Sequence, residues 1–441
     1  MDAIESFRTE KISRILLRIA PPVMLAQLIQ ALYNIVDSLF IGKYAESGLT
    51  ALSIIYPVQL LMIAFGVGIG VGLNTCMASR LGLGRVRASD EYAGVGTPMI
   101  TAVWLVFALT GWFGMPLYAE MTSDTPAVIA DVIDYGRIVC FFSLGLFLES
   151  VWSKVLQAEG DMKTPMYAQI FGALTNIVLD PILIFGMFGV PAMGISGAAI
   201  ATVAGQIVAA IVVFRRGCRK TPALSSYLTR MRMIFHLGLP NILMQSAYTI
   251  YIFGLNLILA GFCDQAVTAL GLYYKWQTFF NIPLNAMMTC IVPVISFNYA
   301  ARNIERCRST LKVSLIFGMS FMIIAITCFM FIPVTLLKVF TSDPLAWDIG
   351  KVAFRIIATS FIPIVTSLIF PVFFQAVGFT VKSSLLTVIR TIILFVPLGY
   401  LFSLFGLTWF WLTFPVTEIV TSLVGYFFYI RFVGNPYPKS V

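Results

Sequence analysis

The chain repeats itself at a constant offset of 218 positions. The matching residues are Pro22 and Pro240, Gln27 and Gln245, Thr-Ala-Leu at 50–52 and 268–270, Arg137 and Arg355, Gln157 and Gln375, and Gly160 and Gly378. One further match, Thr-Ser-Asp at 122–124 and 341–343, is a single residue out of step. An offset that holds over so much of the chain indicates two tandem copies of one structural unit.

The composition places both copies in lipid. Of the 441 residues, 59% are hydrophobic and only 11% are charged, whereas a soluble protein carries roughly 25% charged residues. Mean hydropathy is +0.91. The acidic residues Asp2, Glu5 and Glu10 are unlike the start of a cleaved signal, so we expect the first apolar segment to be a permanent span. A duplicated membrane bundle is typical of a secondary transporter whose substrate path lies between the copies.

A membrane-crossing helix needs about 20 mostly apolar residues. Twelve such segments can be read from the sequence: 15–41, 49–78, 93–119, 128–157, 164–188, 193–214, 236–261, 266–297, 312–338, 346–376, 383–406 and 408–431. We therefore predict an all-α integral membrane protein of twelve transmembrane helices. Because six spans per half is an even number, the two repeats enter from the same side and are parallel.

Three parts follow from these spans. Residues 1–214 are predicted to form an N-terminal six-helix lobe, 215–235 a basic cytoplasmic linker, and 236–441 a C-terminal six-helix lobe. Lys and Arg gather at the N-terminus, in the linker and in every second loop, so both termini are predicted to be cytoplasmic. The net charge of +9 is thus a topology signal rather than a sign of nucleic-acid binding, with contact to lipid headgroups as a weaker alternative.

Polar residues form a stripe along the first span where lipid-facing residues would be apolar. The stripe consists of Gln27, Gln30, Asn34 and Asp37, whose spacing places them on one helical face. In the fifth span, Asn176 and Asp180 are four residues apart and so are neighbours on one face. Ionisable groups inside a membrane are costly and indicate function by default.

Asp37 and Asp180 fall at similar depth in one lobe and are expected to share a site. A proton or a small cation would relieve the repulsion between two carboxylates buried together. With the Asn176 side-chain oxygen, they supply hard oxygen ligands suited to H⁺ or Na⁺, and the sequence does not decide between these ions. The simpler alternative is that each acid only hydrogen-bonds a neighbouring helix.

Other polar residues are weaker candidates for a relay or a cavity wall. Glu149 is either a relay toward the cell interior or the partner of Lys154, and the pairing is slightly favoured. In the C-terminal half, Lys275 and Glu418 lie at similar depth, which predicts a structural ion pair. Asn281 belongs to a polar face of the eighth span that is expected to line a cavity.

Catalytic and nucleotide-binding patterns are missing from the sequence. It contains no HExxH, Walker A, GxSxG or CxxC motif. We therefore expect no enzymatic activity, no metal centre and no cofactor beyond a coupling ion. Transport energy would come from an ion gradient or from a partner.

Two segments resemble signatures of the multidrug and toxic compound extrusion (MATE) family. These are LYNIVDSLFIG at 32–42 and NIVLDPILIFG at 176–186; QAEGD at 157–161, followed by Lys-Thr-Pro, resembles that family's loop between helices four and five. The resemblance implies two six-helix lobes around a V-shaped cavity. It also implies export of cationic or amphipathic compounds in exchange for H⁺ or Na⁺.

The resemblance assigns roles to individual positions. It implies an N-lobe cation site of Asp37, Asn176 and Asp180, with Thr202 or Ser196 as a further oxygen, and a bend of the first helix at Pro22. The seventh and tenth spans lack the interior acids of the NorM-like pattern. The chain is therefore more similar to the DinF-like and MepA-like branch, which puts a C-lobe ion site in doubt.

The leading hypothesis is thus a monomeric, ion-coupled exporter of amphipathic or cationic small molecules in the bacterial inner (plasma) membrane. The alternative is a flippase for a lipid-linked saccharide, for which Lys275 and Arg390 are the available cationic groups. A membrane scaffold or receptor without transport, in which polar stripes only join helices, is the third hypothesis.

Overall fold

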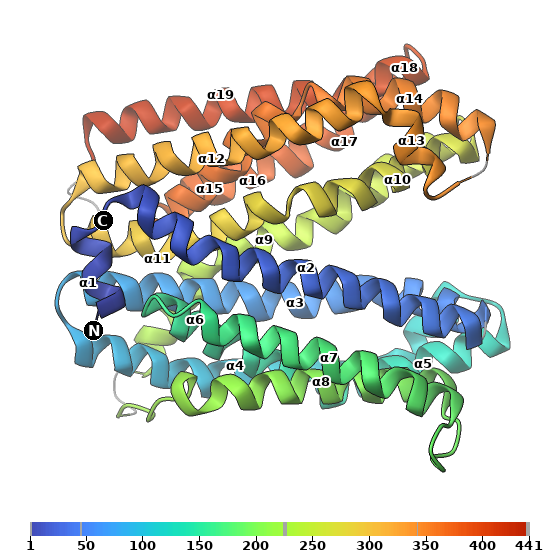
Figure 1. Cartoon of the computed structure of the whole chain (residues 1–441), viewed down its shortest axis with the longest axis horizontal. Helices are drawn as coiled ribbons and strands as arrows, with labels where there is room; N and C mark the ends of the chain where they lie inside the picture. Colours follow the sequence, from blue (N-terminus) through green and yellow to red (C-terminus); the bar gives the residue numbers. More distant parts are fainter. Residues whose placement is uncertain (1, 45, 224–226, 342, 438–441) are drawn as a thin grey trace. The chain divides into compact units, whose positions relative to one another are not determined.

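The computed structural model describes residues 2–44, 46–223, 227–341 and 343–437, and all regular structure in these ranges is helical (Figure 1). In the first half the helices are α1 (Asp2–Thr9), α2 (Ile12–Tyr44), α3 (Glu46–Gly82), α4 (Val86–Thr122), α5 (Pro126–Phe142), α6 (Leu144–Ala158), α7 (Lys163–Phe185) and α8 (Gly194–Gly217). The second half contains α9 (Tyr227–Ala260), α10 (Asp264–Phe280), α11 (Ile282–Ala300), α12 (Ile304–Phe331), α13 (Pro333–Lys338), α14 (Pro344–Ala358), α15 (Phe361–Ala376), α16 (Thr380–Val388), the π-helix η2 (Ile389–Phe395), α17 (Val396–Ser403), α18 (Leu407–Phe410) and α19 (Thr413–Gly434).

The described residues contain ten helical segments that are long and apolar enough to cross a membrane. Two further pairs pass the same test together: α5 with α6, bent by 43°, and α14 with α15, bent by 55°. Counting each bent pair as one span gives twelve, which agrees with the twelve predicted spans. The protein is therefore a multi-pass α-helical membrane protein.

The chain divides into two compact units. The N-terminal unit comprises residues 1–6 and 21–242, and the C-terminal unit comprises 7–20 and 243–441. Helices α2 and α9 therefore each contribute to both units. Within the predicted linker 215–235, α8 continues to Gly217 and α9 begins at Tyr227, while positions 224–226 lie outside the described residues.

The same hydrogen bond recurs in the two units at the offset of the sequence repeat. Arg137 Nε donates to the carbonyl oxygen of Trp112 at 3.1 Å. In the C-terminal unit, Arg355 Nε donates to the carbonyl oxygen of Met330 at 3.3 Å. Both the donors and the acceptors are related by 218 positions, so the duplicated sequence folds into duplicated local structure.

The turns after corresponding helices repeat as well. Gly160 and Gly378 both have a φ of +86°, a left-handed conformation that glycine adopts without a steric penalty. Gly84, with φ +72°, corresponds to Arg302, with φ +58°. The two copies therefore keep the same chain path even where one has lost its glycine.

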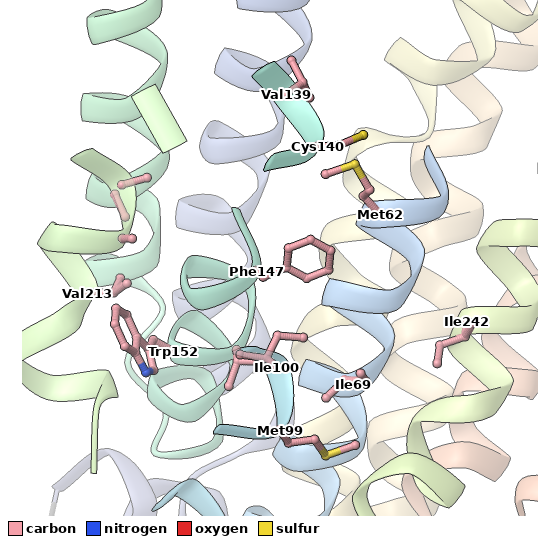
Figure 2. Packing of buried hydrophobic residues seen from close by; sticks show 14 of the residues in the cluster. Met62, Ile69, Met99, Ile100, Val139, Cys140, Phe147, Trp152, Val213 and Ile242 are labelled. Carbon is pink, nitrogen blue, oxygen red and sulfur yellow. The ribbon is translucent and has the colours of Figure 1, made fainter. Parts of the chain in front are cut away.

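The core of the N-terminal unit joins helices through side chains of α3, α4, α5, α6 and α8 (Figure 2). Met62 and Ile69 of α3 lie near Phe147 of α6, and Trp152 of α6 extends toward Val213 of α8. All five are at most 5% exposed. This packing fixes the unit into which the candidate site is built.

Candidate cation-coupling site

Two glycines bring α7 and α8 into backbone contact beside the candidate site. A Cβ added at Gly205 of α8 would lie 2.6 Å from the carbonyl oxygen of Gly172 of α7, and one at Gly172 would lie 2.9 Å from that of Gly205. Only glycine permits so close an approach of two helices. One turn further along α7, Asn176 therefore lies directly against α8.

Asn176 connects the two helices by hydrogen bonds. In the amide orientation that satisfies both of its polar atoms, Nδ2 donates to Asp180 Oδ2 at 3.1 Å and the amide oxygen accepts from the backbone nitrogen of Thr202 at 3.2 Å. Asn176 is 2% exposed and Asp180 is fully buried. Asn176 thus holds the Asp180 carboxyl group in a fixed position relative to α8.

Asp37 of α2 meets Asp180 of α7 inside the N-terminal unit. Their carboxyl groups are within hydrogen-bonding reach of each other, and Asp37 is only 9% exposed. Among the described residues, Asp37 Oδ1 has no hydrogen-bond partner. Because two carboxylates cannot hydrogen-bond without a proton between them, this geometry has room for one proton.

A second layer of side chains surrounds the acid pair, and the sequence did not point to most of it. Tyr33 of α2 lies near both carboxyl groups. The Tyr135 hydroxyl, on α5, accepts a hydrogen bond from Gln59 Nε2 of α3 at 3.3 Å and also hydrogen-bonds Thr202. The site therefore draws on α2, α3, α5, α7 and α8. Of Tyr33, Gln59 and Tyr135, only Tyr33 could have been found from its spacing, because it lies one helical turn before Asp37.

The rest of the polar stripe on α2 lies outside this buried cluster. Gln27 is partly buried, while Gln30 and Asn34 are exposed. Pro22 lies within α2, next to the point where this helix passes from one unit to the other. The cavity-lining role of the stripe and the bending role of Pro22 stay predictions.

Glu149 is held by hydrogen bonds from α6 and α7. Ser153 Oγ donates to Glu149 Oε1 at 2.6 Å, and Gln169 of α7 is a second partner. Lys154 Nζ donates to Gln157 Oε1 at 2.9 Å. Lys154 nevertheless acts electrostatically on the Glu149 carboxyl group, so the pairing also stays a prediction. The relay role stays a prediction.

The predicted ion pair between Lys275 and Glu418 was wrong. Glu418, 1% exposed, accepts from Arg390 Nη2 at 2.6 Å and also bonds the Ser367 hydroxyl. Lys275 Nζ lies 5.0 Å from the centre of the Phe340 ring. Similar depth along the chain does not fix which way a helix face turns, and the face of η2 rather than that of α10 presents a cation to Glu418.

Asn281 lies where α10 gives way to α11. It is partly buried, and its backbone nitrogen donates to the Gln277 carbonyl oxygen at 2.8 Å, which closes the last turn of α10. Its place at a helix break was not anticipated, because the sequence was read as one uninterrupted span over 266–297. Its predicted cavity-lining role is untested.

A duplicated helical bundle with twelve spans and a buried acid pair defines a polytopic membrane transporter. The model of the MatE family matches two segments of the chain, residues 22–182 and 240–401. The starts of these segments are separated by the same 218 positions as the sequence repeat. The chain therefore belongs to the MatE family of multidrug and toxic compound extrusion transporters.

Curated relatives are similar over most of their length. The FAD transporter of Shewanella oneidensis is 24% identical over 94% of both chains. The probable multidrug resistance protein NorM of Thermotoga maritima is 27% identical over 79% of this chain and 76% of its own. The multidrug export protein MepA of Staphylococcus haemolyticus is 23% identical over 96% and 94%. NorM and MepA proteins both match, so the branch within the family stays a prediction.

Solved structures share the fold. An outward-facing multidrug resistance MATE transporter of the MOP superfamily superposes with a TM-score of 0.91 at 22% identity, covering 98% of both chains. A MOP superfamily transporter from Pyrococcus furiosus, described as having a binding pocket of reversed polarity, gives a TM-score of 0.90 at 21% identity over 99% of both chains. The two-repeat architecture of the family is therefore that of this chain.

Proposed function

We propose that the protein exports organic cations or drug-like amphipathic compounds in exchange for protons that bind at Asp37 and Asp180. The observation that carries this proposal is the contact between two buried carboxyl groups from different helices. Two negative charges repel each other strongly when they lie close together and away from water. A proton relieves that repulsion and allows α2 and α7 to remain in contact.

Loss of the proton would change the packing of α2. An ionised Asp37 and an ionised Asp180 separate, and α2 carries Asp37 on a helix already weakened by Pro21 and Pro22, which lack backbone N–H donors. Substrate and proton then favour different positions of α2. A ligand shifts such an equilibrium only through its different affinity for the two states, and this difference couples export to the proton gradient by alternating access.

The class of substrate is proposed from the relatives. MepA and NorM are named for multidrug export or resistance, while the relative from Shewanella is named an FAD transporter. The flippase alternative depended on free cationic groups at Lys275 and Arg390. It is disfavoured because Arg390 is neutralised by Glu418. We further propose that the protein lies in the bacterial plasma membrane with its termini in the cytoplasm.

Reconstituted protein tests this function directly. Proteoliposomes would receive a pH gradient or a Na⁺ gradient, imposed separately, and the movement of ethidium and of FAD would be followed. We expect ethidium transport that a pH gradient drives and a Na⁺ gradient does not. Transport of FAD alone would replace the proposed substrate class, and transport driven only by Na⁺ would replace the proposed coupling ion.

A further inference from the structure

The N-terminal unit contains an apolar groove that is separate from the acid pair. Its volume is about 490 Å³, and its walls come from α4, α5, α6 and α8. The walls include Trp104, Phe142, Leu148, Trp152, Ile211 and Phe214. The groove lies beside the 43° bend between α5 and α6. A volume of this size is within the range of ligand sites in proteins.

Of the two tryptophans at the groove, Trp104 is partly buried and can present only its apolar surface to an occupant, whereas Trp152 is 5% exposed and packs in the core behind it. Trp104 Nε1 donates to the carbonyl oxygen of Phe141 at 3.1 Å, and Trp152 Nε1 donates to Thr97 Oγ1 at 2.9 Å. Both indole N–H groups are thus already satisfied inside the protein. On α8, Ile211 is 65% exposed and Phe214, whose ring lies 5.3 Å from that of Trp152, is 52% exposed. Such a surface fits a hydrocarbon chain better than a polar ligand.

A positively charged residue follows the groove wall along α8. Ile207, Ile211 and Arg215 follow one another at intervals of four along α8, so Arg215 continues the row of the groove wall by one turn. Arg215 is exposed and forms no ion pair with any residue that the structure describes. Its neighbour Arg216 differs, because Asp161 lies 3.6 Å from its guanidinium group. The α8 wall of the groove is thus followed, one turn on, by a cation that no described acid pairs.

We propose that this groove binds an anionic phospholipid, with one acyl chain against Trp104, Ile211 and Phe214 and the headgroup phosphate at Arg215. The charge pattern favours an anionic lipid over a zwitterionic one, because one Arg near a membrane surface adds about fivefold to the affinity for an anionic headgroup. The acyl chain accounts for the apolar walls, and Arg215 accounts for the selectivity.

Tryptophan fluorescence in nanodiscs tests this proposal. The protein would be placed in phosphatidylcholine nanodiscs containing a small fraction of lipid with brominated acyl chains, either phosphatidylglycerol or phosphatidylcholine. Bromine quenches tryptophans that it contacts. We expect brominated phosphatidylglycerol to quench more than the phosphatidylcholine, and Arg215→Gln to lower the apparent phosphatidylglycerol affinity about fivefold. Arg87→Gln, at an exposed arginine of α4 that is already paired with Glu91 at 3.7 Å, should behave like the wild type.

A second variant locates the lipid. Replacing Trp104 by Phe keeps the groove apolar and removes its accessible reporter, so the excess quenching by phosphatidylglycerol should disappear. Equal quenching of the wild type by both lipids, or an unchanged affinity in Arg215→Gln, would overturn the headgroup assignment. Excess quenching that survives the loss of Trp104 would place the lipid elsewhere and overturn the groove assignment.

Discussion

Asp37 and Asp180 are the side chains on which coupling depends. The two residues come from different helices, and both are buried. Among the described contacts, the nearest acidic group to either one is the other. The corresponding positions of the second repeat, 218 residues later, are Leu255 and Leu398. A leucine can neither bind a proton nor coordinate a cation. The acid pair therefore has no counterpart at the matching place in the C-terminal unit.

Removing either acid should uncouple transport. Asp37→Asn and Asp180→Asn replace a group that binds a proton by a neutral one of similar shape, so pH-driven ethidium efflux should fall to the level of empty liposomes. Asp134→Asn, at an exposed acid on α5, is the matched control and should retain efflux. Gradient-driven efflux in either site variant, at equal protein content, would refute the assignment.

The Arg390–Glu418 pair should contribute to stability rather than to coupling. Both side chains are buried, at 6% and 1% exposure, so Glu418→Gln leaves Arg390 without its counter-charge and should lower stability by about 3–5 kcal/mol. The double variant Arg390→Met with Glu418→Leu should recover most of that loss. Thermal unfolding in detergent, followed by circular dichroism, measures both. A double variant less stable than the single one would contradict this interpretation.

Residue spacing predicted part of the site and could not predict the rest. Asp37, and Asn176 with Asp180, were found because each interrupts an apolar helix at helical spacing. Gln59 and Tyr135 were not, because single polar residues on α3 and α5 carry no periodic signal and meet the acids only through packing. The partner of Glu418 was mistaken for the same reason, since helix rotation is set by tertiary contacts.

Among the helices, α7 and α8 hold the site together. Their backbones touch at Gly172 and Gly205, one turn before Asn176 reaches Thr202. Any side chain at this crossing would separate the helices. The geometry of Asn176 and Asp180 therefore depends on two residues that have no polar side chain of their own.

Gly205→Ala should impair transport without touching the acids. Its Cβ would lie 2.6 Å from the Gly172 carbonyl oxygen, and relief of that clash moves Asn176 away from Thr202. We expect a stability loss of about 1–3 kcal/mol and reduced ethidium efflux per folded molecule. Gly114→Ala in α4 is the control, because nothing lies within 4 Å of its added Cβ. Equal activity of the two variants would show that the helix crossing does not matter for the site.

Helix number was predictable from the sequence, whereas helix breaks were not. Long apolar runs require lipid-spanning helices, so the twelve spans could be read directly. The bends near Ser143 and Ser360 occur without proline at the break. At each, the serine hydroxyl donates to a carbonyl three residues earlier, at 2.9 Å to Cys140 and 2.6 Å to Ile357. Serine competes with helical bonding in this way, but most serines in spans do not break a helix, so the signal is weak.

The molecule as a whole is a duplicated fold in which the two copies have diverged in chemistry. The repeated arginine bonds and left-handed turns preserve the architecture. The polar site residues of the first copy, by contrast, are replaced in the second: Asp37, Asn176, Asp180 and Thr202 correspond to Leu255, Leu394, Leu398 and Val420. One such proton site per chain is therefore expected.

A single proton site makes substrate binding depend on pH in a defined direction. If the protonated pair and the bound substrate favour different states, protons and substrate oppose each other's binding by linkage. The apparent affinity for ethidium should therefore weaken as pH falls and strengthen as pH rises. Fluorescence titrations of the purified protein across a pH series would measure this. An affinity that strengthens on acidification would reverse the proposed coupling.

Proton release on substrate binding tests the central claim most directly. Ethidium would be added to detergent-solubilised protein in a weakly buffered solution, and a pH indicator would record the protons set free. We predict that the wild type and Asp134→Asn release protons when ethidium binds. Asp37→Asn and Asp180→Asn should release none, provided that they still bind ethidium. Equal proton release from the site variants and the wild type would mean that the coupling proton is held elsewhere.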